Sequence, residues 1–265
     1  VRAYFRSPWN EIAEWILWKV LRWIHSFADL TLVTSPQIAA DLAMHGIHPT
    51  ELWPKGVNTT QFHPQFQSTA MRERMSGGEP NDFLVVYIGR LGKEKRLTDL
   101  KLILQELLSR GIPVRLCFVG DGPQMSELQE TFQDTPTTFL GSLQDIDLSE
   151  AFASGDVFVM PSDSETLGFV VMESLASGVP VVASRAGGLI DLIDDETTGF
   201  LVPTNDSSAF AEKIELLYRN PTLRNQMGIQ GRLAAMEWSW EASMNYLRRQ
   251  AYPKAVANFA KQRST

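Results

Sequence analysis

Two glutamates, Glu165 and Glu173, are separated by seven residues across the predicted start of a helix. Gly168 lies between them, and a residue without a side chain lets the backbone approach a ligand closely. The first N–H groups of a helix have no partner within it, so those of Gly168, Phe169 and Val170 are suited to bind a diphosphate. Carboxylates beside such a site accept hydrogen bonds from sugar hydroxyls. The alternative is that one glutamate caps the helix and the other is solvated.

Basic side chains are expected near this helix start, because a helix end alone is a modest counter-ion for two phosphates. Arg90 directly follows the apolar run 83–88, and Lys95 lies in the loop before the next predicted helix. Both side chains have the charge and the length to bind a diphosphate. Lys93 and Arg96, in the same loop, are also explained by simple solvation.

Two glycine-containing turns carry weaker signals. Residues 120–123, Gly-Asp-Gly-Pro, form a turn between a strand and a helix, with a proline suited to the first helical turn. Gly187 and Gly188 open another predicted helix and would let the backbone approach a ligand, and Arg185 before them is available to an anion. Turns of both kinds are often only structural.

Asp145 and Asp147 have the spacing of a metal-binding Asp-x-Asp motif. They precede the predicted helix 148–153, where Asp147 makes a good N-cap, and we favour the cap. The sequence has no His and Cys cluster typical of zinc sites and no Gly-x-x-x-x-Gly-Lys-Ser/Thr loop typical of NTPases. We therefore expect no cofactor and no metal.

The elements that must position these residues alternate from residue 83 onward. Six apolar runs have strand length and composition: 83–88, 114–119, 137–140, 157–160, 179–183 and 200–202. Helix candidates lie at 97–110, 124–132, 148–153, 168–177 and 189–193, and then at 207–218 and 221–237. This alternation predicts an α/β fold with a doubly wound parallel sheet, in which ligands bind at the carboxyl ends of the strands. Glycine-rich and polar residues fall at those ends: Gly89, Arg90, 120–123, Gly141, Ser142, Pro161 and Ser162.

Residues 1–62 have a different pattern, typical of the last part of another α/β domain. A Trp-rich helix is followed by a strand at 30–34, a helix at 36–45 and an extended segment at 52–57. We divide the chain into 1–62, the remnant of an N-terminal domain, 63–238, a Rossmann-like domain, and 239–265, a C-terminal return helix. The first residue is Val1 and no signal or transit pattern precedes the helix, so we expect a truncated start that leaves targeting unreadable.

The apolar run 15–27 is too short to span a bilayer and contains Lys19, Arg22 and His25. It is suited to lie at a membrane surface with its tryptophans as interfacial anchors, or to pack in a missing domain.

The composition excludes some partners. A net charge of −7 argues against nucleic acid, because binding to phosphates needs clustered Lys and Arg. The single cysteine, Cys117, lies in an apolar run and is interpreted as a buried strand residue. The sequence does not determine the oligomeric state.

Taken together, Gly89-Arg90 with Lys95, Gly-Asp-Gly-Pro at 120–123 and the two glutamates resemble the retaining glycosyltransferases of family 4, which have the two-domain GT-B fold. The resemblance covers about residues 28–240. It implies that Arg90 and Lys95 contact the diphosphate, Glu165 the donor sugar, and Glu173 the ribose. The implied catalytic residues are Arg90, Lys95 and Glu165, and the implied donor-binding residues are Gly89, Gly120, Gly122, Ser142, Leu143, Thr166, Leu167, Gly168, Phe169 and Glu173. The turn after Gly141 would hold the base, uracil.

Within this family, several phrases are similar to the plant and algal sulfolipid synthases: 28–33, 52–57, 155–162, 164–168 and 185–188. Lys55 is informative, because most family members have asparagine there, whereas Asn58 departs from the usual aspartate. The similarity implies transfer of sulfoquinovose from UDP-sulfoquinovose to diacylglycerol, by an enzyme bound peripherally to a plastid (chloroplast) or cyanobacterial membrane. The acceptor-binding domain would then be largely absent here, and we expect this chain to be inactive alone.

Alternative functions remain open. The chain is also compatible with another family 4 enzyme, such as a glucosyl- or mannosyltransferase, with a UDP-sugar epimerase of the same fold, or with a non-catalytic nucleotide-sugar binder. The expected partners are a UDP-sugar donor and a lipid acceptor at a membrane surface.

Overall fold

The computed structural model describes residues 8–53 and 56–262. The chain divides into two compact units, Val1–Gly56 with Glu241–Thr265, and Val57–Trp240. We call them the first and the second unit and describe each by itself. The three segments expected from the sequence, 1–62, 63–238 and 239–265, remain a prediction.

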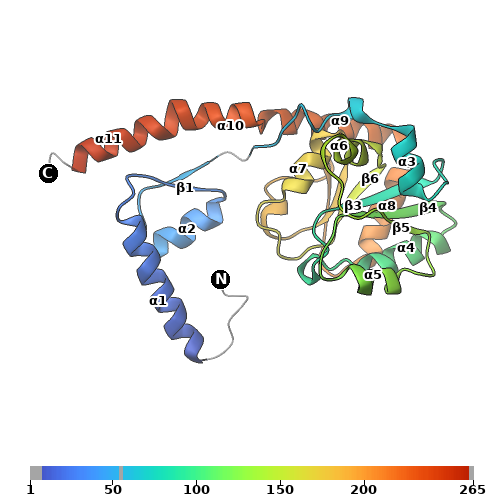
Figure 1. Ribbon diagram of the computed structural model, residues 1–265, viewed down its shortest axis with the longest axis horizontal. Coiled ribbons are helices and arrows are strands. Elements are labelled where there is room, and N and C mark those ends of the chain that lie inside the picture. Colours follow the sequence, from blue (N-terminus) through green and yellow to red (C-terminus); the bar gives the residue numbers. More distant parts are fainter. Residues whose placement is uncertain (1–7, 54–55, 263–265) are drawn as a thin grey trace. The chain divides into compact units, whose positions relative to one another are not determined.

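The second unit is built on a six-stranded parallel sheet (Figure 1). Its strands are β3 (Phe83–Ile88), β4 (Val114–Val119), β5 (Thr137–Phe139), β6 (Val157–Met160), β7 (Val181–Ser184) and β8 (Gly199–Val202). Their spatial order is β5-β4-β3-β6-β7-β8, so the chain runs outward from β3 on one side and outward from β6 on the other. The predicted doubly wound α/β sheet is confirmed. Such a reversal leaves a crevice at the carboxyl ends of the two central strands, here β3 and β6.

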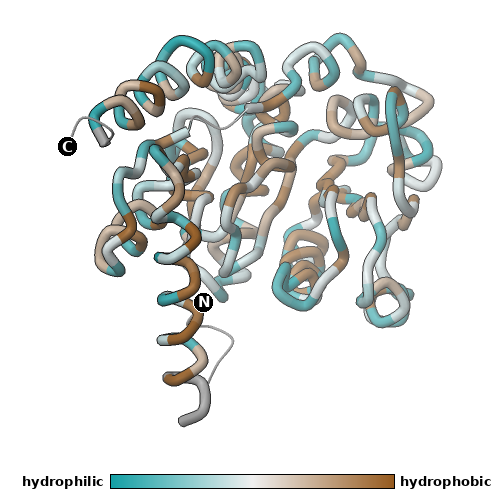
Figure 2. Tube along the Cα trace, turned by 60° about the vertical axis from the view of Figure 1, so that its left-hand side comes forward, coloured by the Kyte–Doolittle hydropathy of each residue, from teal (hydrophilic) through white to brown (hydrophobic). Residues whose placement is uncertain are grey.

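Helices cover both faces of this sheet (Figure 1). They are α3 (Thr69–Ser76), α4 (Asp99–Ser109), α5 (Met125–Thr131), α6 (Asp145–Ser154), α7 (Phe169–Ala176), α8 (Ser207–Arg219) and α9 (Pro221–Glu237). On one face α4 packs against α8, and on the other α3 packs against α6 and α7 against α9. Because both faces are covered, the central strands β3 and β6 are continuous apolar runs, whereas the edge strand β5 is half-buried. Brown, hydrophobic stretches run through the interior of the tube in Figure 2.

The prediction that Cys117 is a buried strand residue is confirmed. This residue is fully buried in β4, and burial raises the pKa of its thiol to about 12. On the other face of the sheet, the ring of Tyr87 packs against those of Phe118 and Phe158 on the neighbouring strands. Of these three residues, Tyr87 lines the hollow described below.

Two local predictions in the second unit are wrong. A 3₁₀ turn, Gly187–Leu189, followed by an irregular segment, takes the place of the helix expected at 189–193. Helix α6 begins at Asp145 rather than Leu148 and is preceded by Gln144, so Asp147 lies inside the first turn and is not the N-cap. Its carboxylate lies 3.7 Å from the Arg74 guanidinium.

The first unit contains a two-stranded parallel sheet and helices. Its elements are α1 (Pro8–His25), β1 (Thr31–Val33), α2 (Pro36–Met44), β2 (Thr50–Leu52), α10 (Trp240–Tyr246), a π-helical turn (Leu247–Ala251) and α11 (Tyr252–Gln262). Helix α11 joins the rest of the unit through Asn258, whose Nδ2 donates to the Asp29 carbonyl at 2.9 Å, and through a Lys254–Glu51 ion pair. Lys55, which carried part of the resemblance, lies outside the described residues.

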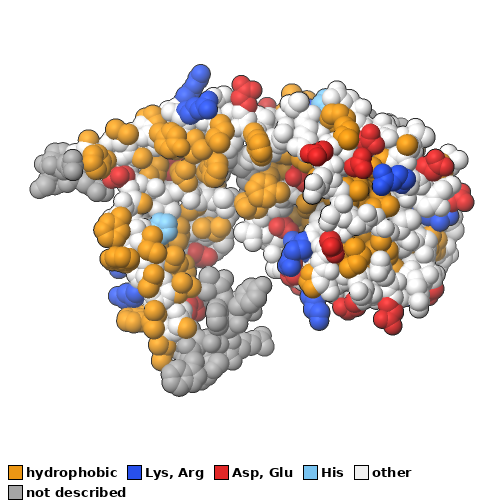
Figure 3. All heavy atoms as spheres, in the orientation of Figure 1, with side chains coloured by type: hydrophobic (Ala, Val, Ile, Leu, Met, Phe, Trp, Pro, Cys, Tyr) orange, Lys and Arg blue, Asp and Glu red, His pale blue; other side chains and the backbone are white. Residues whose placement is uncertain are grey.

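Helix α1 exposes an apolar face along its length (Figure 3). Large apolar side chains at least 40% exposed are Ile12, Trp15, Ile16, Leu17, Val20, Trp23 and Ile24, and Phe27 follows just after the helix. The opposite face is half-buried, and there Trp18 stacks on His45 with ring centroids 3.6 Å apart. Among the described residues, none of the helices combines the length and the hydropathy needed to cross a bilayer.

Candidate functional site

A hollow of about 330 Å³ opens at the carboxyl ends of β3 and β6, where the sheet reverses direction. We call it the donor-edge hollow. It lies entirely within the second unit and is lined by Tyr87, Gly89, Arg90, Glu94, Lys95, Met160, Glu165, Phe169 and Val170. Six residues predicted from the sequence therefore meet in one place: Gly89, Arg90, Lys95, Glu165, Phe169 and Val170.

Lys95 and Glu165 form an ion pair in this hollow. The Lys95 Nζ lies 2.5 Å from the Glu165 Oε2, and the two side chains are only 18% and 13% exposed. Lys95 ends the 3₁₀ turn Lys93–Lys95 after β3, and Glu165 lies in the loop between β6 and α7. The reversal of the sheet thus brings together two residues that are far apart in the sequence.

Glu165 also caps the helix that follows it. Its Oε1 accepts hydrogen bonds from the backbone N–H groups of Thr166 at 3.2 Å and Gly168 at 3.1 Å. Burial raises the pKa of the Glu165 carboxyl, but the Lys95 bond and charge and the backbone N–H groups outweigh it and hold the pKa below its usual value. The carboxyl is therefore ionised at neutral pH. The alternative that one glutamate caps the helix applies to Glu165, which is also paired with Lys95.

Arg90 lies at the rim and is paired with Glu94. The Arg90 Nη2 contacts the Glu94 Oε1, and the side chains are 62% and 35% exposed. The backbone beside it is fixed from below, because the buried Tyr87 hydroxyl donates to the Arg90 carbonyl at 2.9 Å. Burial, followed by the charge of Glu165, raises the pKa of Tyr87, so the phenol stays a neutral donor.

Gly168 begins α7 from a conformation that side chains rarely adopt. Its φ is +64°, in the left-handed region, where glycine is favoured. This turn directs the start of α7 to the hollow, and Phe169 and Val170 line it. Thr166 is exposed and Leu167 half-buried in the loop before the turn.

Gly187 and Gly188 hold this loop in place. A Cβ atom at Gly187 would lie 2.2 Å from the Glu165 carbonyl oxygen, and one at Gly188 would lie 2.3 Å from that of Thr166. The Gly188 N–H donates to the Glu165 carbonyl at 2.7 Å. The close approach predicted for this glycine pair is therefore to the Glu165 loop.

Glycines of the first two turns pack against each other in a similar way. A Cβ atom at Gly120 would lie 2.0 Å from the Gly89 carbonyl oxygen, and one at Gly122 would lie 2.4 Å from that of Leu91. The Gly120 N–H donates to the Gly141 carbonyl at 2.8 Å, which joins this turn to the one after β5. These glycines bring the strand ends close together.

Eight of the ten predicted donor-binding residues lie outside the lining of the donor-edge hollow: Gly120, Gly122, Ser142, Leu143, Thr166, Leu167, Gly168 and Glu173. Ser142 is exposed and Leu143 half-buried after β5. Glu173 lies one turn inside α7, and no described group forms a hydrogen bond or ion pair with its carboxyl. Burial alone raises the pKa of Glu173 to about 7.

Sequence reasoning missed three residues of the hollow: Tyr87, Glu94 and Met160. Tyr87 and Met160 looked like ordinary core residues in apolar strands, and Glu94 like part of a solvated loop. Arg185, which we considered for anion binding, is paired with Asp195 and donates to the Leu201 carbonyl at 3.0 Å. No group of His, Cys, Asp and Glu suited to hold a metal ion occurs among the described residues.

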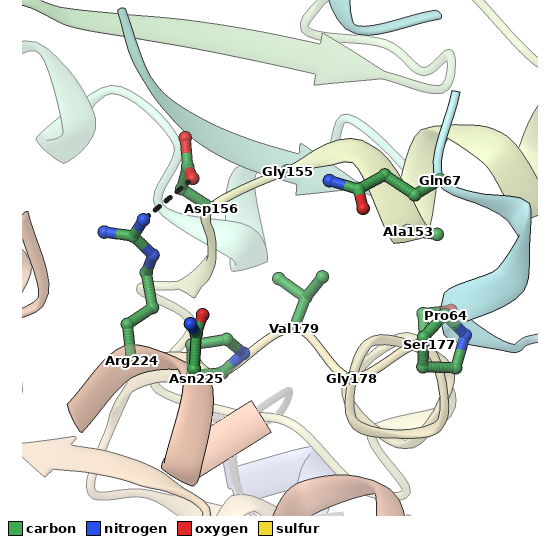
Figure 4. A pocket seen from close by; sticks show the side chains of 11 residues that line it. Pro64, Gln67, Ala153, Gly155, Asp156, Ser177, Gly178, Val179, Arg224 and Asn225 are labelled. Atoms are coloured by element: carbon green, nitrogen blue, oxygen red, sulfur yellow. Dashed lines mark ion pairs between the residues drawn. The ribbon is translucent and has the colours of Figure 1, made fainter. Parts of the chain in front are cut away.

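A second hollow, of about 220 Å³, lies at the opposite edge of the same sheet, before β6 and β7 (Figure 4). We call it the amino-edge hollow. Asp156 and Arg224 lie together at one end of it, with the Arg224 Nη2 3.6 Å from the Asp156 Oδ1. Gln67 and Asn225 also line it.

The chain matches a known family over the part that contains the whole donor-edge hollow. A model of the glycosyl transferases group 1 matches residues 72–234. The chain belongs to this family. It is therefore a glycosyltransferase by family, and the predicted class of enzyme is confirmed.

Curated relatives are similar over most of the chain. Sulfoquinovosyl transferase SQD2 of Arabidopsis thaliana is 42% identical over 246 residues, which cover 91% of this chain and 48% of that protein. A GDP-mannose-dependent alpha-mannosyltransferase of Corynebacterium glutamicum is 36% identical over 191 residues, or 71% of this chain and 44% of that protein. The chain spans about half the length of these relatives.

Solved structures confirm the GT-B type of fold. Sucrose-phosphate synthase from Thermosynechococcus elongatus matches with a TM-score of 0.71 and 29% identity, over 89% of this chain and 61% of that chain. Anabaena HepE, solved with UDP-glucose, matches with a TM-score of 0.72 and 22% identity, over 85% of this chain and 64% of that chain. At that identity, the second match speaks for the fold alone.

Proposed function

We propose that this chain provides the donor site of a retaining family 4 glycosyltransferase that transfers sulfoquinovose from UDP-sulfoquinovose to diacylglycerol. The observation that carries the proposal is the half-buried Lys95–Glu165 pair beside Arg90, at the point where the parallel sheet reverses. The 42% identity to a sulfoquinovosyl transferase over 91% of the chain supports this donor.

The proposed chemistry rests on the side chains that line the donor-edge hollow. Arg90 and Lys95 stabilise the diphosphate that leaves when the glycosidic bond to the donor breaks. The acceptor hydroxyl attacks on the same face, which retains the configuration, and gives its proton to an oxygen of the leaving diphosphate. No metal takes part. Glu165 is held in position by Lys95 and the Gly168 N–H, and its two oxygens keep lone pairs for hydroxyls of the donor sugar.

In this proposal the ribose and the uracil of the donor lie along the carboxyl edge of the sheet. The unpartnered Glu173 carboxyl accepts hydrogen bonds from the ribose, and the uracil lies at the turn of Ser142 and Leu143. The glycines at 89, 120 and 122 bring this edge together, and the loop of Thr166, Leu167, Gly168 and Phe169 encloses the sugar and phosphates.

The acceptor side of the proposal rests on α1. Its exposed apolar face with Trp15 and Trp23 suits the interface of a bilayer, where tryptophan is favoured, and Lys19 and Arg22 suit anionic headgroups. We propose peripheral attachment to a plastid or cyanobacterial membrane. Sedimentation with vesicles of anionic lipid tests this part, and Trp15→Ser with Trp23→Ser is expected to abolish it without weakening UDP binding.

Calorimetry on the 265-residue chain tests the donor site. UDP and UDP-sulfoquinovose are expected to bind in the micromolar to millimolar range, and GDP-mannose much more weakly. Absence of UDP binding at millimolar concentration contradicts the proposal. A transfer assay of the longer protein with diacylglycerol and the three donors then tests the acceptor.

A mannosyltransferase is the second candidate, because relatives that use GDP-mannose match 71% of the chain. Preference for GDP over UDP in the same titration favours it. Interconversion of UDP-sugars without an acceptor favours an epimerase, and donor binding without any turnover of the longer protein favours a binding protein.

A further inference from the structure

The donor-edge hollow contains as many carboxylates as cations. Arg90 and Lys95 carry two positive charges, and Glu94 and Glu165 carry two negative charges, so the formal charge of these lining residues sums to zero. A neutral balance is unusual for a site that binds a diphosphate, since each carboxylate repels the ligand. One of the two carboxylates must therefore release its cation when a diphosphate binds.

The two ion pairs differ in how firmly they are held. Glu165 is almost buried, and it accepts bonds from Lys95 and two backbone N–H groups, so it stays in place. The Glu94 carboxylate is one-third exposed, and Arg90 is the one group that an ion pair or hydrogen bond joins to it among the described residues. Exposed pairs of this kind are weak and exchange readily.

Glu94 is also fixed where it competes with a ligand. The Ser162 hydroxyl, just after β6, donates to the Glu94 carbonyl at 3.0 Å and ties its backbone to the wall of the hollow. Both carboxylate oxygens lie 2.5 Å from the position that a Cβ atom would take at Gly92, so the side chain folds back over that glycine. This leaves the carboxylate on the Arg90 guanidinium, at the rim.

From these contacts we infer that Glu94 is an internal counter-ion that Arg90 exchanges for the diphosphate when the donor binds. The inference rests on the proposed function. The Lys95–Glu165 pair stays formed, while the Arg90–Glu94 pair opens and the guanidinium turns to the phosphates. Glu94 thereby weakens donor and UDP binding and favours release of the product, without contacting the ligand.

Titration calorimetry on the 265-residue chain tests this with two probes, UDP and inorganic pyrophosphate. Glu94→Gln removes the competing charge and is expected to tighten binding of both probes about two- to fivefold, the strength of one exposed ion pair. Asp99→Asn is the matched control, because it breaks the neighbouring Arg96–Asp99 pair, which does not line the hollow. It is expected to leave both affinities unchanged.

A double-mutant cycle separates exchange at Arg90 from simple repulsion. In the Arg90→Ala background, most of the gain from Glu94→Gln is expected to disappear. A gain of the same size in both backgrounds overturns the exchange, and so does weaker or unchanged binding to Glu94→Gln, or a gain equally large in Asp99→Asn. Tighter pyrophosphate binding with no advantage for UDP supports the exchange and contradicts the proposed donor site.

Discussion

The two edges of the parallel sheet both carry two basic side chains beside a carboxylate, but their hydrogen bonds go to different partners. At the amino edge, Arg72 donates to the carbonyls of Pro80, Asp82 and Ser154 at 2.6 to 2.9 Å and lies 2.6 Å from Asp156. At the donor edge, the partners that Lys95 and Arg90 have among the described residues are the side-chain carboxylates of Glu165 and Glu94.

The difference separates ion pairs that hold the fold from those that are open to a ligand. A guanidinium that satisfies several backbone carbonyls cannot turn away without leaving them unpaired inside the protein. An exposed cation that is paired with one side chain, as Arg90 is with Glu94, exchanges that partner at little cost. Whether a cation is bonded to backbone carbonyls or to side-chain carboxylates therefore indicates, better than its distance from a hollow, whether it is available to a ligand.

The largest effect is expected at Asp156, which joins the amino edge. Its Oδ2 accepts from the Leu84 N–H at 2.8 Å as well as from Arg72, and its Oδ1 faces Arg224. Asp156→Ala leaves two mostly buried guanidinium groups without their counter-ion and is expected to lower the free energy of unfolding by about 3 kcal/mol. Urea unfolding measures this. A loss below about 1 kcal/mol, typical of exposed pairs, contradicts the structural role.

The next effect is expected at the donor edge and concerns turnover. Lys95→Ala or Arg90→Ala in the complete enzyme is expected to lower kcat by at least ~10², because a group that stabilises the leaving diphosphate is lost. Lys93→Ala is the control, since Lys93 is exposed in the same loop and does not line the hollow. Turnover near that of the control in either variant contradicts the assignment.

The next effect is expected at Glu173 and concerns how the free energy of unfolding depends on pH. Its pKa is raised to about 7 from an ordinary value of 4.5, so the folded protein binds this proton more tightly than the unfolded chain. The resulting stability is complete below the lower value and is lost as the pH rises through 7. Between about pH 5 and 8 the free energy of unfolding is expected to fall by roughly 2 kcal/mol from this group.

Glu173→Gln isolates this contribution. The glutamine does not titrate, so the variant is expected to lose this part of the pH dependence in urea unfolding series. An unchanged slope between variant and parent shows that another group is responsible.

The smallest effect is expected at Arg185, which follows β7 at the donor edge. Like Arg72 at the amino edge, it donates to a backbone carbonyl as well as to a carboxylate. Its guanidinium contacts Asp195 and the Leu201 carbonyl, and the side chain is 49% exposed. Arg185→Ala is expected to cost less than about 1 kcal/mol of stability and to leave UDP affinity unchanged. A clear loss of UDP affinity in calorimetry contradicts the comparison, because an arginine bonded to a backbone carbonyl would then also bind the ligand.

The sequence predicted the strands well, because a sheet covered on both faces requires apolar runs that end at glycine or proline. The bounds of β3, β4 and β6 are as expected. Helix α3 was not predicted, since its sequence, Thr-Ala-Met-Arg-Glu-Arg-Met-Ser, has few apolar residues and little periodicity. The helix expected at 189–193 does not form where the glycine pair packs against the Glu165 loop.

The sequence predicted most of the charged residues of the candidate site, but not the ion pairs that they form. Arg90, Lys95 and Glu165 follow strands or open helices, and those positions are visible in a sequence. Which cation binds which carboxylate depends on loops brought together by the sheet, so the Lys95–Glu165 and Arg90–Glu94 pairs were not foreseen. The contacts of these residues with a donor remain a prediction.

The donor-edge hollow belongs wholly to the second unit, whereas the Trp-rich helix belongs to the first. A substitution in one unit therefore leaves the residues of the other unit unchanged. Val57–Trp240 is one continuous stretch between the two segments of the first unit, so it can be exchanged between family members as a single piece. Under the proposed function, a chimera that carries this stretch within the first unit of a relative is expected to keep the donor preference of the stretch.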